Sequence, residues 1–151
     1  MEKDILFMKA ALKEAKKAYD IGEVPIGAVI VKDNKIIARG YNKREKNNMA
    51  TAHAEMIAIE KACKKLNNWR LSDCTLYVTL EPCPMCTGAI INARIPRVVF
   101  GASDTKSGAC GGYCDLSNAN ILNHTFEIQK GVLEEDCKDI LNKFFKELRK
   151  K

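Results

Sequence analysis

Thr75-Leu76-Tyr77-Val78-Thr79-Leu80-Glu81-Pro82-Cys83-Pro84-Met85-Cys86 is the stretch of sequence that decides the fold. Its first half is rich in β-branched and aromatic residues and is stopped by Pro82, as expected of a strand that ends there. We expect a helix from about Cys83, because Pro84 is tolerated in a first helical turn, where its missing N–H would be unpaired anyway. Cys83 and Cys86, three residues apart, then share one face. The stretch predicts a strand that leads directly into a helix carrying two thiols.

A second motif, His53-Ala54-Glu55, lies in a helical pattern that we expect from about Thr51 to Leu66. Residues two apart on a helix project about 200° apart, so His53 and Glu55 in the first turn can converge only on something beyond the helix end. Free backbone N–H groups and the positive end of the helix dipole favour thiolate and anionic oxygen there. We therefore expect two helix N-termini to meet, one bringing imidazole and carboxylate and the other both thiolates.

One imidazole and two thiolates form a ligand set that zinc prefers, and three protein ligands leave a fourth tetrahedral position for water. We expect one catalytic Zn²⁺ ion per subunit, held by His53, Cys83 and Cys86. Zinc lowers the pKa of a bound water to about 7, which makes hydroxide available at neutral pH. Glu55, beside a ligand, fits a residue that takes the proton of this water and passes it on.

Two other interpretations of the cysteine pair stay open. A closed structural zinc site would need a fourth ligand, for which the candidates are Cys63, Cys74, Cys110, Cys114 and His124. Structural zinc usually shows paired elements, whereas this sequence has a single Cys-x-x-Cys pair. A thioredoxin-like redox motif would leave His53 and Glu55 unexplained. Both alternatives therefore account for less of the sequence than a catalytic site does.

The remaining sequence supplies helices and strands around these motifs. Apolar residues recur at steps of three and four from Ile5 to Tyr19, before Gly22, and from Leu133 to Leu148, which predicts two amphipathic helices. Short strands are expected at Ile26–Val31, Lys35–Arg39, Arg97–Phe100 and Phe126–Ile128, the first two joined as a hairpin through Asp33-Asn34. We expect a small helix near Asp115 in the polar connection Gly101–Asn123. The pattern predicts one α/β domain over residues 1–151, with three α/β/α layers around a mixed five-stranded sheet.

Composition limits the class of protein. The 151 residues are 46% hydrophobic and 29% charged, and no apolar run approaches the ~20 residues of a membrane span. The N-terminal residues show no apolar signal segment, and seven cysteines, an odd number, suit a reducing compartment better than a disulfide framework. We therefore expect a cytoplasmic protein. The net charge of +6 favours an acidic partner such as RNA, although many soluble proteins carry a similar charge.

Several runs resemble the bacterial tRNA-specific adenosine deaminases of the cytidine deaminase superfamily: Glu23–Ala28, Thr51–Glu55, Leu76–Cys83 and Arg97–Ala102. The similarity covers nearly the whole chain. The His-x-Glu and Pro-Cys-x-x-Cys core is shared with cytidine, guanine and other base deaminases, so it indicates only the superfamily and its chemistry. The more discriminating residues are Asp104, Lys106, Gly108, Asn123-His124 and Phe144-Phe145, while Ala50 and Gly112 depart from the proline and serine expected there.

The resemblance implies a cytidine-deaminase-like fold, a homodimer, and conversion of adenosine to inosine at the wobble position of a tRNA anticodon. Zinc-bound hydroxide would attack C6 while Glu55 shuttles protons, and the base would be splayed out of its stem-loop into a pocket. The implied substrate contacts are Asn42, Val24, Pro25, Ile26 and Ala54 around the base, and Asp104, Lys106, Phe145 and Arg149 along the anticodon loop.

Each of these contacts also has a purely structural interpretation. Asn42 could be a turn residue, and Val24 to Ile26 could be core. The outer charges could be solvated and Phe145 could be buried. Two other functions stay open: deamination of a free nucleobase or nucleoside, such as guanine or cytidine, and zinc-dependent RNA binding without catalysis.

Overall fold

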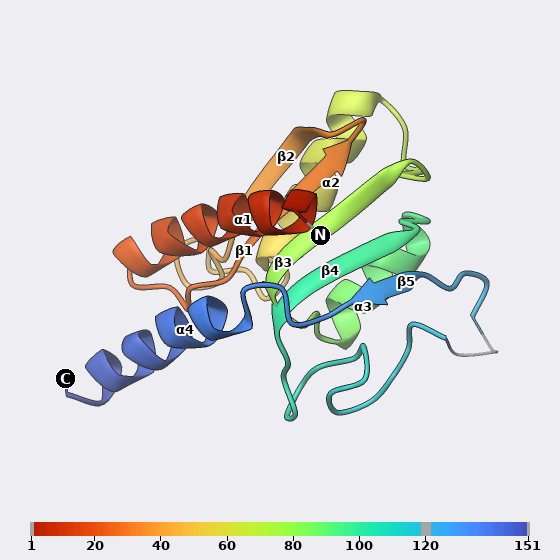
Figure 1. The fold of residues 1–151 in the computed structure, drawn as a ribbon. Coiled ribbons are helices and arrows are strands. Elements are labelled where there is room, and N and C mark those ends of the chain that lie inside the picture. The colour runs from red at the N-terminus through yellow and green to blue at the C-terminus, as the bar shows by residue number, and fades with distance from the viewer. Residues whose placement is uncertain (1, 119–121, 151) are drawn as a thin grey trace.

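The computed structural model describes residues 2–118 and 122–150. The helices are α1 (Glu2–Asp20), α2 (Ala54–Leu66), α3 (Pro84–Asn92) and α4 (Glu134–Arg149); the strands are β1 (Gly27–Lys32), β2 (Lys35–Tyr41), β3 (Cys74–Leu80), β4 (Arg97–Ala102) and β5 (Glu127–Gln129). The strands form one sheet in the order β2-β1-β3-β4-β5, with α1 and α4 on one face and α2 and α3 on the other (Figure 1). The predicted three-layer fold with a mixed sheet is confirmed.

The direction of the strands brings the functional motifs to one edge of the sheet. Strand β1 is antiparallel to β2 and β3, whereas β3, β4 and β5 run parallel. The predicted hairpin turn is present, with Asp33 and Asn34 at positive φ of 52° and 62°, as in the tight turns that suit twisted strands. As a result, the start of β1 and the ends of β2, β3 and β4 lie at the same edge, which is where open α/β sheets bind ligands.

Alternation along β3 divides the core between the two faces. Leu76 and Val78 point into the cluster that packs α2 and α3 on the sheet, whereas Tyr77 belongs to the cluster under α1 and α4. Period-two alternation with apolar residues on both faces is typical of a central strand buried on both sides. The stretch that decides the fold therefore lies at the centre of both cores.

Three details differ from the sequence-based expectations. Helix α2 begins at Ala54 rather than near Thr51, because His53 has an extended backbone with φ −79° and ψ 155°. No helix forms near Asp115 in the described part of its connection; Asp115 forms an isolated bridge with Cys110 instead. Leu148 does not turn inward and is 54% exposed. Residues 119–121 of the same connection lie outside the described residues.

Within the described residues, no helix combines the length and the apolar character that crossing a membrane would need.

Candidate active site

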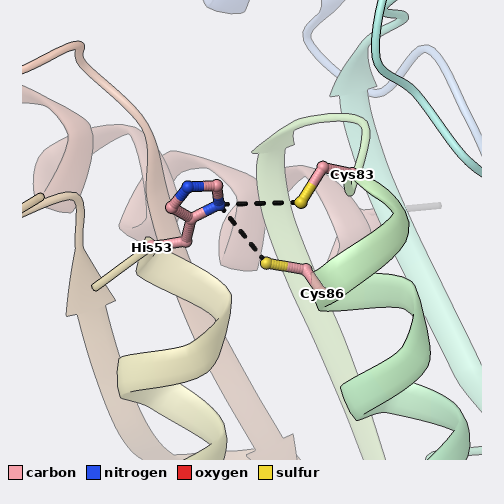
Figure 2. Close-up of side chains that lie close together, drawn as sticks. All are labelled: His53, Cys83 and Cys86. Atoms are coloured by element: carbon pink, nitrogen blue, oxygen red, sulfur yellow. Dashed lines mark hydrogen bonds between the residues drawn. The ribbon is translucent and has the colours of Figure 1, made fainter. Parts of the chain in front are cut away.

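Two helix starts bring the predicted metal ligands together. His53 and Cys83 are the N-cap residues of α2 and α3, both with extended backbone, and Cys86 lies in the first turn of α3 behind Pro84. His53 Nδ1 lies 3.7 Å from Cys83 Sγ and 3.6 Å from Cys86 Sγ. Figure 2 shows the imidazole pointing from the start of α2 toward both sulfurs. The N-cap position of His53 allows this, since an extended residue can direct its side chain across the helix end.

The spacing of these atoms fits a tetrahedral zinc ion. With Zn–S of about 2.3 Å and Zn–N of about 2.0–2.1 Å, tetrahedral geometry holds sulfur and nitrogen about 3.6 Å apart. The three ligand atoms all lie within 4.8 Å of one another, and among the described residues this is the one such group of three or more. None of the candidate fourth ligands joins it: His124, for example, contacts the Ile95 carbonyl oxygen at 2.8 Å. The donor set therefore matches a site with three protein ligands.

The electrostatics of the two thiols prepare one of them for a cation. A hydrogen bond with Cys86, and a further one with His53, lower the pKa of Cys83 to about 4. The same pairing and burial raise the pKa of Cys86. The contact with Cys83 raises the pKa of His53. The lowered pKa favours the thiolate form of Cys83, which is the form that binds a metal ion.

Glu55 supplies a buried carboxyl group next to this cluster. It is the second residue of α2 and is 4% exposed. Burial, together with the negative charge of Cys83, raises the pKa of Glu55 to about 7. A carboxyl group with a pKa close to the working pH is suited to both accepting and donating a proton.

A cavity of about 230 Å³ is lined by His53, Cys83 and Glu55, whereas Cys86 is fully buried beside them. Among the predicted substrate contacts, it is lined by Val24, Ile26, Asn42, Ala54 and Asp104. The Asn42 side chain is oriented by two hydrogen bonds: its Nδ2 donates to the Val24 carbonyl at 3.2 Å, and its Oδ1 accepts from the Arg44 backbone N–H at 3.1 Å. An amide can form up to four hydrogen bonds, so Asn42 keeps capacity for a ligand.

The other predicted contacts lie outside this cavity. Lys106 and Phe145 line a neighbouring cavity of about 520 Å³, which shares Val24 and Asp104 with the first. Pro25 is buried but lines neither cavity, and Arg149 is exposed at the end of α4 without reaching either. The predicted substrate contacts thus fall into two groups. One group lines the cavity at the candidate metal ligands, and the other lines the cavity beside α4.

Four further residues line the inner cavity and were not singled out as contacts from the sequence: Arg44, Leu80, Glu81 and Ser107. Arg44 lies in a stretch that reads only as a polar loop, and Ser107 carries no motif of its own. Glu81 could have been noticed from the sequence, because it follows a buried strand and directly precedes Pro82. A carboxyl group that is buried there is costly unless it has a hydrogen-bond partner.

A candidate metal cluster of one histidine and two cysteines, with a buried carboxyl group lining the same cavity as two of them, fits hydrolytic removal of an amine from a ring, and the class of protein is a deaminase. A family model of the MafB19-like deaminases matches residues 1–149. The chain belongs to this family.

Individual proteins agree with this assignment. The tRNA-specific adenosine deaminase of Bacillus subtilis (strain 168) is 55% identical over 151 residues, which cover 100% of this chain and 94% of the relative. A solved structure from a study of A-to-I editing by tRNA:A34 deaminases at the wobble position matches with a TM-score of 0.85 and 43% identity, covering 89% of this chain and 98% of that one. The guanine deaminase of Bacillus subtilis matches with a TM-score of 0.63 and 49% identity over 66% of this chain and 64% of its own. The resemblance predicted from the motifs is confirmed.

Proposed function

We propose that residues 1–151 form a single deaminase domain that converts adenosine to inosine at the wobble position of a tRNA anticodon. The observation that carries the chemistry is the buried Glu55 carboxyl beside the His53, Cys83 and Cys86 cluster. The choice of substrate is supported by the full-length similarity to the Bacillus subtilis enzyme, whose name specifies tRNA and adenosine.

We propose that His53, Cys83 and Cys86 hold one Zn²⁺ ion per subunit, which supplies an activated water nucleophile at neutral pH. Glu55 takes a proton from the attacking water and passes it to the ring nitrogen next to C6. It then delivers a proton to the departing amine. Burial raises the pKa of Glu55 in the metal-free protein, which suits a carboxyl group that accepts a proton in one step and donates it in another.

The two cavities suggest how an anticodon loop is bound. The splayed adenine occupies the inner cavity, where Val24 and Ile26 form the wall, Asn42 hydrogen-bonds the base, and Ala54 offers its backbone. Pro25 supports this wall from behind.

The neighbouring nucleotides follow the outer cavity along Asp104, Lys106 and Phe145, with Arg149 as the outermost contact. The 39% exposure of Phe145 leaves an aromatic face on which a base can stack.

The proposal includes a homodimer in the cytoplasm. All seven cysteines are free, as a reducing compartment requires. Exposed large apolar residues, among them Leu6, Met49 and Trp69, offer surface for contact between subunits. Light scattering coupled to gel filtration measures the subunit number directly.

The proposed function is tested with the zinc-loaded protein and four substrates. These are an anticodon stem-loop with adenosine at the wobble position, and free guanine, cytidine and adenosine. Inosine in the RNA and no ammonia from the free compounds supports the proposal. Ammonia from guanine or cytidine with unchanged RNA would establish the free-base alternative, and tight RNA binding without either product would indicate a binding module.

A further inference from the structure

The Glu81 carboxyl group, between the end of β3 and the start of α3, has no part in the chemistry above. It is 3% exposed and lines the inner cavity. Its Oε1 accepts the backbone N–H of Asp104 at 3.0 Å, and its Oε2 accepts those of Cys110 and Gly112 at 2.9 Å and 2.8 Å. Hydrogen bonds to a carboxylate are roughly twice as strong as neutral ones. Glu81 therefore ties the loop after β4 to the end of β3.

The loop has the shape that this contact requires. A Cβ atom on Gly112 would lie 2.5 Å from Glu81 Oε1, and one on Gly108 would overlap the same carboxyl group. A glycine backbone is what allows the chain to approach so closely. Two positions of the loop are thus adapted to one buried side chain on another element.

The tied loop carries side chains to the mouth of the cavity. Asp104 Oδ1 accepts the backbone N–H groups of Lys106 at 3.0 Å and Ser107 at 3.1 Å, which closes a turn of the kind that aspartate favours. Asp104 and Ser107 line the inner cavity, and all three residues line the outer one. The place of the Asp104 backbone, set by Glu81, therefore decides where this turn stands over the site.

We propose that Glu81 is a positioning residue that holds the 104–107 turn against the bound RNA. The inference rests on the proposed function, which supplies the RNA. The metal ligands and Glu55 belong to α2, α3 and their N-caps. Loosening the turn therefore weakens substrate binding and leaves the chemical step largely intact.

Glu81→Gln separates the two halves of the contact. The remaining carbonyl oxygen faces Cys110 and Gly112, where it forms two hydrogen bonds, and the new NH₂ group meets the Asp104 N–H donor to donor. We expect KM for the stem-loop to rise about tenfold, as for the loss of one hydrogen bond to a charged group, with stoichiometric zinc and kcat within about twofold.

Two glycine variants complete the set. Gly108→Ala keeps Glu81 and displaces the loop from it, so it should raise KM by a similar factor. Gly88→Ala on α3 is the matched control, since its added Cβ meets nothing within 4 Å, and it should change neither constant.

The experiment measures kcat, KM and zinc content for these proteins, together with amide hydrogen exchange at residues 104, 110 and 112. A rise in KM for Glu81→Gln and Gly108→Ala, with faster exchange at Asp104 alone in Glu81→Gln, supports the proposal. Loss of zinc and kcat at constant KM, or unchanged exchange at Asp104, overturns it. Wild-type protein that leaves the RNA unmodified overturns the proposed function instead, and hydrogen exchange then still decides whether Glu81 anchors the turn.

Discussion

The two faces of the sheet each bury a carboxyl group, and the pKa values of the two groups are shifted in opposite directions. On the face covered by α2 and α3, Glu55 is 4% exposed and burial raises its pKa to about 7. On the face covered by α1, Asp4 is 6% exposed, yet its pKa is lowered. The exposed fraction of the residue therefore does not by itself decide the direction of the pKa shift.

Desolvation dominates at Glu55, whereas hydrogen-bond partners dominate at Asp4. Asp4 accepts two hydrogen bonds of 2.9 Å from the Arg97 guanidinium and one of 2.8 Å from the Tyr77 hydroxyl, and the Arg97 bonds are the main cause of its lowered pKa. Glu55 instead faces the thiolate of Cys83, whose charge opposes ionisation as burial does. A carboxylate that is held by a cation stays ionised and acts as a structural group, whereas one whose burial outweighs its stabilising contacts is suited to proton exchange near neutral pH.

The largest expected effect comes from removing the metal from the α2 and α3 face. Chelation, or Cys86→Ala, should abolish deamination and lower the melting temperature, because the ligand set ties two helix starts together. Activity assays, metal analysis and thermal unfolding check this, with Cys63→Ala as the control on the same face. Full activity of Cys86→Ala with no bound metal would refute the assigned site.

Replacing Glu55 tests whether the carboxyl group with the raised pKa transfers protons during the reaction. Glu55→Gln should lower kcat by roughly 10²–10⁴-fold with zinc still stoichiometric, because the amide cannot shuttle protons. Glu60→Gln, exposed on the same helix, should behave as wild type. A Glu55→Gln protein that loses its zinc would show that Glu55 is a ligand, and the assigned role would be wrong.

A pair of glycines compares the packing of the two faces. A Cβ on Gly40 would lie 2.5 Å from the Ala54 carbonyl oxygen at the start of α2, and one on Gly27 would overlap the backbone of Ala11 and Ala15 in α1. Both alanine variants should lose about 1–3 kcal/mol of stability, as overpacked sites do. Gly40→Ala should also weaken zinc binding, because it shifts the helix start next to His53. Denaturant unfolding and zinc titration measure both effects, and equal zinc affinity in the two variants would contradict the distinction.

The smallest effect concerns the acid dependence of the Asp4 pair. Because the pKa of Asp4 in the folded protein is below its ordinary value of 3.8, its contribution to stability is fully present above that value and is lost as the pH falls through the folded-state pKa. Asp4→Asn should lower the free energy of unfolding by about 1 kcal/mol at pH 7. It should also make that free energy fall less steeply as the pH drops into the acidic range. The exposed Asp139→Asn serves as the control. An unchanged acid limb in Asp4→Asn would show that the pair contributes nothing.

The candidate metal ligands could be found from the sequence, because residues within each motif are only a few positions apart. Cys83 and Cys86 lie in one helical turn, and the position of Pro84 indicated where that turn begins. His53 was expected inside the first turn of its helix, whereas it is the N-cap residue and the helix begins after it. The strands and the hairpin could be predicted for the same reason, because side-chain alternation and the residues that form tight turns are read over a few positions.

The tertiary structure alone decided what depends on partners distant in the sequence. The hydrogen bonds between Asp4 and Arg97 span 93 residues, and those that Glu81 accepts from Cys110 and Gly112 span 29 and 31. Whether a buried carboxyl group is charged, anchors a loop or exchanges protons depends on which donors the fold brings to it. By itself the sequence singled out a candidate metal-binding group, which the structure brings together, and Glu55 as the candidate proton carrier beside it. The packing of the sheet and helices decided the acidity of Glu55 and the position of the 104–107 turn, which lines the same cavity.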